Sequence, residues 1–337
     1  VRLACSRNAA VVPAATSILC YLSERAGELP SLIASGAARP LVGWLGDADV
    51  ARQVRAVAAV RRLSGAQHGG EMAVVEAGGV GPLVRLLRGG GGAQAEAMHA
   101  LHNLARCVES RRAVAAEAEA VAACVDVLQS ATDQATKEHA AAALACLSDT
   151  GNHQDIVAAG GIDGLVALLQ GGSAQGQLQA VRAMASLAED TGLHAVLAGA
   201  GLAHVVGLAG GVEGEARDFA SSLLHKLATG GDEGAQAAVA SSEAAVGLLV
   251  SQLGGSLAEQ QAAAGSLRHV ARFAEARQAM VGCGGVAALV ATAQVKGLDA
   301  HGLQEACLAV AALSCGGGRE AVAAAGGADV LIEAVRR

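Results

Sequence analysis

The stretch AVVEAGGVGPLVRLL, residues 73–87, places two adjacent glycines directly before the apolar pairs Leu83–Val84 and Leu86–Leu87. Similar arrangements return as IVAAGGIDGLVALL (156–169), MVGCGGVAALVATA (280–293) and AVAAAGGADVLIEAV (321–335). Glycine adopts positive φ angles and carries no Cβ. The pair therefore predicts a point where a short helix stops, the chain turns sharply, and the next helix begins close to the first.

The glycine pair recurs at a nearly fixed interval. Its second residue, or the residue that replaces it, stands at Ala37, Gly79, Ala120, Gly161, Gly201, Ala245, Gly285 and Gly327, in steps of 40 to 44 residues. Such a period is the sequence signature of a repeat array. Residues 117–128 and 242–253 keep the apolar pattern without the glycine pair, so the glycines are preferred but not required.

Each unit divides into three predicted helices. A short segment such as 152–159 precedes the glycine pair, an apolar helix such as 80–88 follows it, and a longer helix such as 93–105 comes after a glycine-rich loop. The longer helix carries apolar residues at positions i, i+3, i+4 and i+7, namely Ala97, Ala100, Leu101 and Leu104. This is the buried stripe of an α-helix. No segment alternates as a strand does, so the sequence predicts an all-α protein.

Composition supports closely packed helices and argues against several classes of partner. Of the 337 residues 53% are hydrophobic and 1% aromatic, so alanine and leucine must form the core, and alanine is the best helix former. The net charge of −7 gives no reason to expect nucleic acid. No run of 18 strictly apolar residues predicts a membrane span. The eight cysteines form no C-x-x-C pair and are interpreted as free thiols of a reducing, cytoplasmic compartment, the alternatives being a disulfide framework or a zinc site.

The repeated pattern GG-[VI]-x-x-L-V-x-L-L, followed by A-x-x-A-L-x-N-L-A, resembles the armadillo repeat over essentially the whole chain. HEAT repeats share the length range, but they are two-helix units that do not favour this glycine pair. The resemblance implies a right-handed α-solenoid (superhelix) of about eight three-helix repeats, with the third helices lining a concave groove.

We expect a single array over residues 1–337 that is partial at both ends. Residues 9–23 are interpreted as a third helix without its first two, and residues 328–337 as a second helix without its third. Both ends would expose an apolar face, and solenoids need polar capping repeats. We therefore expect further repeats or partner subunits to cover both ends of what is a piece of a longer array.

Armadillo proteins that bind extended peptides carry an asparagine on the third helix, one turn after a tryptophan. The asparagine positions in this chain hold Tyr21, Arg62, Asn103, Cys146, Ser186, Lys226, His269 and Ala312. Asn103 alone matches, and no tryptophan stands four residues before any of these positions. One hydrogen bond contributes about 1 kcal/mol net, so one rung cannot hold a peptide, and a nuclear-import-receptor function is disfavoured.

The same face, extended by one turn each way, is nearly neutral. It carries the basic residues Arg55, Arg62, Arg106, Arg182, Lys226 and Arg272 and the acidic residues Glu24, Glu96, Asp149, Glu189 and Glu305. Its most polar patches combine His99, His102 and Asn103 with Arg61–Arg62, and His225–Lys226 with Arg268–His269. The candidate partner-binding residues are Arg62, His99, Asn103, Arg182, Lys226 and His269. The alternative is that these patches are ordinary solvated polar faces.

No pattern in the sequence indicates a catalytic or metal-binding site. His99 and His102 could share a metal, but no acidic or cysteine ligand is placed beside them and no H-E-x-x-H occurs. We expect no catalytic residues, cofactor or metal. The sequence favours a non-catalytic protein–protein interaction scaffold with unidentified protein partners. The alternatives are a structural subunit of a cytoskeletal or ciliary complex and the substrate-recruiting arm of a ubiquitin ligase.

Overall fold

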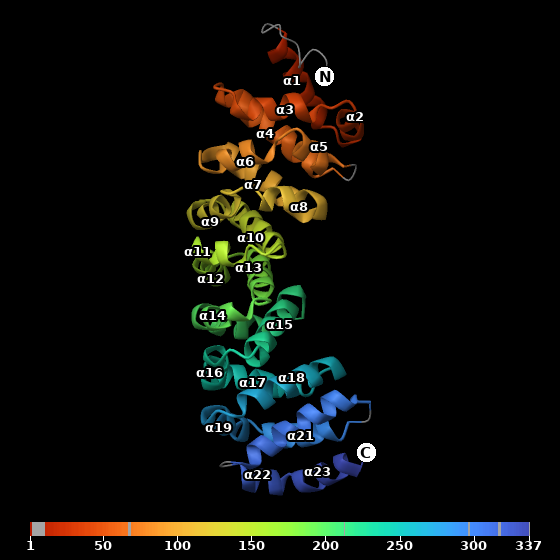
Figure 1. Ribbon diagram of the computed structural model, residues 1–337, viewed down its shortest axis with the longest axis vertical. Coiled ribbons are helices and arrows are strands. Elements are labelled where there is room, and N and C mark those ends of the chain that lie inside the picture. Colours follow the sequence, from red (N-terminus) through yellow and green to blue (C-terminus); the bar gives the residue numbers. More distant parts are fainter. Residues whose placement is uncertain (2–10, 67–68, 212, 296, 316–317, 337) are drawn as a thin grey trace. The chain divides into compact units, whose positions relative to one another are not determined.

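The computed structural model describes residues 1, 11–66, 69–211, 213–295, 297–315 and 318–336. All regular secondary structure in these ranges is helical (Figure 1), as the sequence predicted. The chain forms two compact units, Val1–Ser186 and Leu187–Arg337. Four repeat anchors, from Ala37 to Gly161, fall in the first unit, and four, from Gly201 to Gly327, fall in the second.

The first unit repeats a pattern of two short helices and one long one. Its first helices are α2 (Leu29–Ala34, after the 3-10 turn η1, Ala26–Glu28), α5 (Gly70–Glu76), α8 (Val108–Ala115) and α11 (His153–Ala158). Its second helices are α3 (Ala38–Gly43, continued by η2, Trp44–Gly46), α6 (Val80–Leu87), α9 (Ala120–Ser130) and α12 (Gly161–Gly171). Its third helices are α1 (Val12–Ser23), α4 (Val50–Ser64), α7 (Gly91–Arg106), α10 (Gln134–Ser148) and α13 (Ala174–Leu187).

The second unit follows the same order with one exception. It begins with η3 (Thr191–Leu193) and α14 (His194–Ala209), a single helix where a first and a second helix were expected. Its third helices are α15 (Glu215–Thr229), α18 (Leu257–Val270) and α21 (Ala300–Ser314). The intervening pairs are α16 (Glu233–Ser241) with α17 (Glu243–Gln252), α19 (Ala274–Gly282) with α20 (Gly285–Ala293), and α22 (Arg319–Ala324) with α23 (Gly327–Arg336).

The two glycines of a pair have different structural roles. Gly78 has a φ of +75°, which L-residues other than glycine rarely adopt, and so reverses the chain after α5. Gly79 has an ordinary φ, but a Cβ there would lie 2.6 Å from Val74 Cγ1. The same division holds at residues 160–161, 284–285 and 326–327. The prediction that the pair supplies both the turn and the close approach is confirmed.

Where the first glycine is replaced, the corner changes. Ala200 occupies that place in α14, and the helix runs through from residue 194 to residue 209. The predicted break at the Gly201 anchor is therefore wrong, because alanine favours continuation of the helix and resists positive φ. Between α16 and α17 the chain turns instead at Ser242, which has extended angles (φ −89°, ψ 100°) and whose side chain accepts a hydrogen bond from the Ala245 N–H.

The core lies between the helices of successive repeats and is made of alanine, leucine and valine. The stripe predicted in α7, Ala97, Ala100, Leu101 and Leu104, is at most 1% exposed. Several third helices begin at side-chain caps: Asp49 caps α4, Asp133 caps α10, and Ser256 forms a capping box with Glu259 at α18. In α7 and α15 a glycine, Gly90 or Gly214, stands at the N-cap without a side-chain hydrogen bond.

One continuous stretch, Thr191–Ala209, is long and apolar enough to cross a membrane by length and composition alone. Half of it is buried inside the protein, where α14 packs against α15, α16 and α17. A buried core helix of a soluble protein satisfies the same criterion, so the stretch is weak evidence of a span. Its uninterrupted length follows from the missing break at Ala200.

Candidate functional site

The third helices of the first unit pack side by side. α1 contacts α4, α4 contacts α7, and α7 contacts α10, while Ser186 of α13 is hydrogen-bonded to the end of α10. Residues equivalent to positions 96, 99, 103 and 106 of α7 lie on one side of each third helix because of its 3.6-residue period. We call the surface formed by these positions the third-helix face, and describe it separately in each unit.

Arg62 borders an open depression between α1 and α4. The depression has a volume of about 300 Å³ and is lined by Ser17, Cys20, Tyr21 and Glu24 from the α1 side and by Val54, Arg55, Ala58 and Arg62 from α4. Arg62 is half-buried, and its Nη1 lies 3.4 Å from Ser23 Oγ. Burial raises the pKa of the Cys20 thiol, and the charges of Arg55 and Arg62 act in the opposite direction. The predicted residue Arg62 therefore lies in a concave part of the third-helix face that is lined by both apolar and charged side chains.

His99 belongs to a cluster of three histidines at the junction of α7 and α10. Its ring stacks on that of His139 with centroids 3.9 Å apart, and the Nδ1 atoms of His102 and His139 are 3.1 Å apart. Burial, followed by the charge of His139, lowers the pKa of His99 to about 4 and that of His102 to about 3. The cluster is therefore uncharged near neutral pH, and His99 presents a ring rather than a positive charge.

Among the described residues, no group of three or more His, Cys, Asp or Glu side chains is arranged to hold a metal ion. The histidine cluster does not qualify, because its rings stack and hydrogen-bond to one another. The close Nδ1–Nδ1 distance requires one ring to donate a proton and the other to accept it.

Asn103 is turned towards the neighbouring repeat. It is 8% exposed, and its Nδ2 donates to the Arg61 carbonyl oxygen at 3.3 Å and to Ser64 Oγ at 3.4 Å, both on α4. If Asn103 binds the backbone of a partner, its Oδ1 can accept a hydrogen bond without disturbing these contacts, whereas a bond donated from Nδ2 requires one of them to be given up. Breaking one such bond costs about 1 kcal/mol, so the geometry also gives Asn103 a role between repeats.

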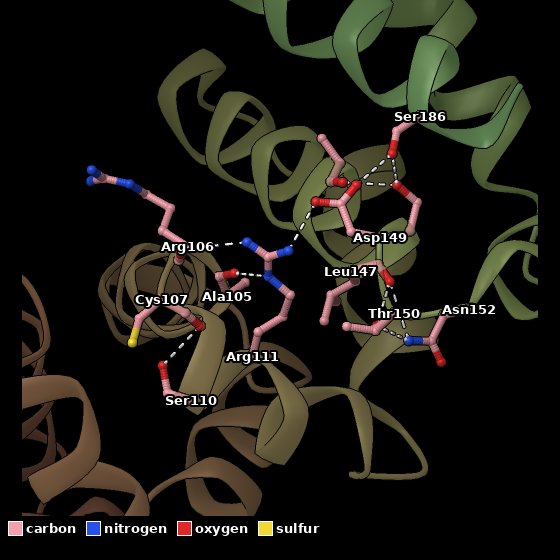
Figure 2. Close-up of polar contacts among 12 residues, drawn as sticks. Ala105, Arg106, Cys107, Ser110, Arg111, Leu147, Asp149, Thr150, Asn152 and Ser186 are labelled. Atoms are coloured by element: carbon pink, nitrogen blue, oxygen red, sulfur yellow. Dashed lines mark hydrogen bonds and ion pairs between the residues drawn. The ribbon is translucent and has the colours of Figure 1, made fainter. Parts of the chain in front are cut away.

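An ion-pair network spans α8, α10 and α13 (Figure 2). Arg111 Nη1 lies 2.9 Å from Asp149 Oδ2, and its Nε donates to the Ala105 carbonyl oxygen at 2.7 Å. Ser186 Oγ donates to Asp149 Oδ1 at 2.8 Å. Asp149, an acidic residue of the third-helix face, is thus neutralised from within the chain. Glu96 is neutralised in the same way by Arg61.

Arg106 and Arg182 have no such partner. Both side chains are exposed, and none of the ion pairs among the described residues involves them. In Figure 2 the Arg106 side chain extends away from Asp149. Burial raises the pKa of Cys146 on α10, and the charges of Arg182 and Arg106 oppose that rise. Both guanidinium groups therefore lie beside the same part of α10.

In the second unit the basic residues of the third-helix face are paired. Lys226 forms an ion pair with Glu189, and Arg272 lies 3.8 Å from Glu233. His269 Nε2 is 2.7 Å from Arg268 Nη2, and Arg268 in turn pairs with Glu305. The predicted residues Lys226 and His269 are therefore each held in a contact with a neighbouring side chain.

Two residues escaped the sequence analysis. His139 stands seven residues before Cys146, in the register of Arg55 and Glu96, so reading that register for histidine would have found it. Arg111 lies on a first helix, where the repeat pattern gives no indication that its side chain reaches the third-helix face. Neither residue was among the candidates, although His139 contacts the candidate His99 and Arg111 pairs with Asp149 on the third-helix face.

No protein-family model and no curated protein matches this sequence. Solved structures do resemble it. An engineered protein from a structural genomics consortium is 30% identical, with a TM-score of 0.76 over 98% of this chain and 82% of that one. A designed armadillo repeat protein in complex with the peptide (KR)4 is 25% identical, with a TM-score of 0.56 over 66% of this chain and 95% of that one.

A third structure comes from work on a phosphorylation switch that controls the interaction between cadherin and beta-catenin, and its TM-score is 0.80. The alignment covers 95% of this chain and 62% of that one at 19% identity, so this likeness concerns the fold alone. The three-helix repeat and the glycine corner agree with these structural likenesses in indicating the same fold. The chain has the armadillo-repeat fold.

Proposed function

We propose that this chain is a non-catalytic protein-binding scaffold whose third-helix faces receive an extended segment of a protein partner. The observation that carries the proposal is the alignment of neighbouring third helices, which repeats the same side-chain positions from one helix to the next. A surface with a regular repeat suits a partner with a regular repeat, and an extended peptide backbone has one. The designed armadillo neighbour bound to (KR)4 supports this use of the fold.

The charged groups of both faces support a binding role rather than catalysis. Arg61 pairs with Glu96, and Arg268 pairs with Glu305, in each case linking neighbouring third helices. General acid–base catalysis needs a group within hydrogen-bond reach of a substrate proton. These groups are instead committed to contacts between repeats, where they stabilise the array.

The proposal also places the scaffold in a larger assembly in the cytoplasm. Exposed apolar side chains on α1, Ile18 and Tyr21, and on α23, Ile332, offer further contact area to neighbouring proteins. The seven cysteines that the structure describes are free thiols, which supports a reducing compartment.

The experiment is selection of peptides from an unbiased displayed library against the full chain, repeated with two variants. Ala58→Trp places a large ring in the depression between α1 and α4. Ala167→Trp adds the same ring at an exposed position of the second helix α12 and is the matched control. We expect selected peptides to lose binding to Ala58→Trp and to keep it with Ala167→Trp. Failure to enrich any peptide, or equal binding to both variants, would contradict the proposal.

A further inference from the structure

On the third-helix face of the first unit, positive charges outnumber negative ones once the ion pairs within the chain are counted. By sequence alone the face holds four arginines, Arg55, Arg62, Arg106 and Arg182, and three carboxylates, Glu24, Glu96 and Asp149. The structure adds two arginines from outside the face, because Arg61 neutralises Glu96 and Arg111 neutralises Asp149. Six arginines therefore stand against three carboxylates, and the near-neutral count conceals a positive surface.

The four arginines of the face retain most of their donors. Arg55 donates through Nε to the Ala51 carbonyl oxygen at 3.1 Å, and Arg62 makes the long contact with Ser23. Arg106 and Arg182 form no ion pair or side-chain hydrogen bond recorded in the described part of the chain. A guanidinium group carries five N–H donors in a planar fork that fits a carboxylate. The face thus offers carboxylate-binding groups that the chain itself does not use.

The second unit provides an internal contrast. Its face also carries basic residues, but Lys226 and Arg272 each have a carboxylate partner and Arg268 is held by Glu305. A basic group that already has a carboxylate partner within the chain has less charge to offer to the carboxylates of a binding partner. The available positive charge is therefore concentrated on the face of the first unit.

On these observations we infer that the third-helix face of the first unit binds an extended acidic peptide segment, rich in Asp and Glu. The inference rests on the proposed function and names the chemistry of its partner. Arg55 and Arg62 would hold one carboxylate in the depression beside Tyr21, whose side chain is 56% exposed. Arg106 and Arg182 would hold others beside α10.

The spacing of the helices suits such a segment. Packed helices lie about 8–10 Å apart, and an extended chain advances about 3.3 Å per residue. Each third helix therefore faces about three residues of the partner. From α4 to α13 a segment of about ten residues, with an acidic residue at every second or third place, can reach all four arginines.

A peptide fits these features better than a single-stranded nucleic acid. Proteins that bind single strands add aromatic side chains on which bases stack, and in the described residues of this face Tyr21 is the one tyrosine, tryptophan or phenylalanine. Glu24 lies beside Arg55 and Arg62 in the same depression and would repel a continuous phosphate backbone. A segment with an acidic residue at every second or third place can avoid it.

The test measures binding of three fluorescent ten-residue peptides to the full chain by anisotropy: alternating Glu-Ser, alternating Lys-Ser and alternating Gly-Ser. We expect the acidic peptide to bind and the other two to bind at least about tenfold more weakly. Raising the ionic strength from about 0.05 M to about 0.2 M weakens the acidic complex, because salt screens exposed charges.

Two double variants localise the site. Arg106→Gln/Arg182→Gln removes two charges from the face, and we expect about 5- to 30-fold weaker binding, since each exposed pair contributes about 0.5–1 kcal/mol. Arg85→Gln/Arg112→Gln removes the same charge from exposed positions on α6 and α8, and we expect less than a twofold change. Equal weakening by both variants would overturn the inference, because only net charge would then matter.

Other outcomes separate this inference from the proposed function. Binding of the basic or the neutral peptide with the same affinity as the acidic one leaves a peptide-binding scaffold and overturns the acidic preference. No binding of the acidic peptide, together with failure of the library selection, contradicts both. A ten-nucleotide uridine RNA that displaces the acidic peptide more strongly than unlabelled peptide does would also overturn the inference.

Discussion

Gly79 packs against Val74 so closely that a Cβ atom on Gly79 would lie 2.6 Å from Val74 Cγ1 and 2.9 Å from the Val74 carbonyl oxygen. Real Cβ atoms do not approach other atoms this closely, so the first and second helices of the repeat can meet at this angle only with glycine at the corner. In three other repeats alanine serves at the equivalent place, at residues 37, 120 and 245. The corner is therefore adjusted separately in each repeat.

Gly79→Ala should destabilise the protein by about 1–3 kcal/mol, because the added methyl group overpacks the corner. The measurement is the urea midpoint of unfolding. Gly199→Ala is the control: Gly199 is exposed in α14, and a Cβ there meets nothing within 4 Å. We expect that control to gain about 0.4–1 kcal/mol. A midpoint for Gly79→Ala that matches or exceeds the native one would contradict this view of the corner.

Arg111 should matter more to stability than its ion-pair partner does. Asp149 is 51% exposed, so Asp149→Asn should cost at most about 1 kcal/mol. Arg111 also donates to the carbonyl oxygens of Ala105 and Arg106 at the end of α7, where a positive charge is favourable. Arg111→Met should therefore cost about 1–2 kcal/mol more than Asp149→Asn. Equal losses in chemical denaturation would show that the carbonyl contacts contribute nothing.

The histidine cluster predicts acid sensitivity of the first unit. The pKa of His99 is about 4 and that of His102 about 3, whereas an unfolded histidine titrates near about 6.5. As the pH falls below about 6.5 the unfolded chain takes up protons first. The stability that depends on these histidines is therefore fully present above about pH 6.5. It falls as the pH drops, down to about pH 4 for His99 and about pH 3 for His102, by at most about 1.4 kcal/mol per pH unit for each histidine.

The charged groups around the cluster modify this response. Burial is the largest cause of each lowered pKa; the positive charges of Arg61, Arg106 and Arg182 act in the same direction, and Glu96, Asp133 and Glu138 oppose them. The measurement compares urea midpoints at about pH 7.5 and about pH 5.5. His99→Leu/His102→Leu should show a shallower loss than the native protein. A double variant as acid-sensitive as the native protein would refute the role of the cluster.

Much of the fold follows from the sequence because its signals are local. The glycine corner, the apolar stripe of α7 and the cap at Asp49 each depend on a few neighbouring residues. The continuous helix α14 shows the limit of this reasoning. The anchor Gly201 is present there, but the residue before it, Ala200, determines whether the chain turns.

The candidate site was less accessible to sequence analysis, because its charge depends on contacts between repeats. Glu96 and Asp149 count as negative charges in the sequence, yet partners 35 and 38 residues away neutralise them. Asn103 matches a peptide-binding position, yet its side chain bonds to α4. Contacts between residues so far apart in the sequence form only when successive repeats pack against one another.

The most direct test of the central claim is hydrogen exchange of the full chain with and without the acidic ten-residue peptide. The account predicts added protection in α4, α7, α10 and α13, with little change in the first and second helices α5, α6, α8 and α9. Protection confined to those first and second helices would contradict it, because the bound segment would then lie away from the third-helix face.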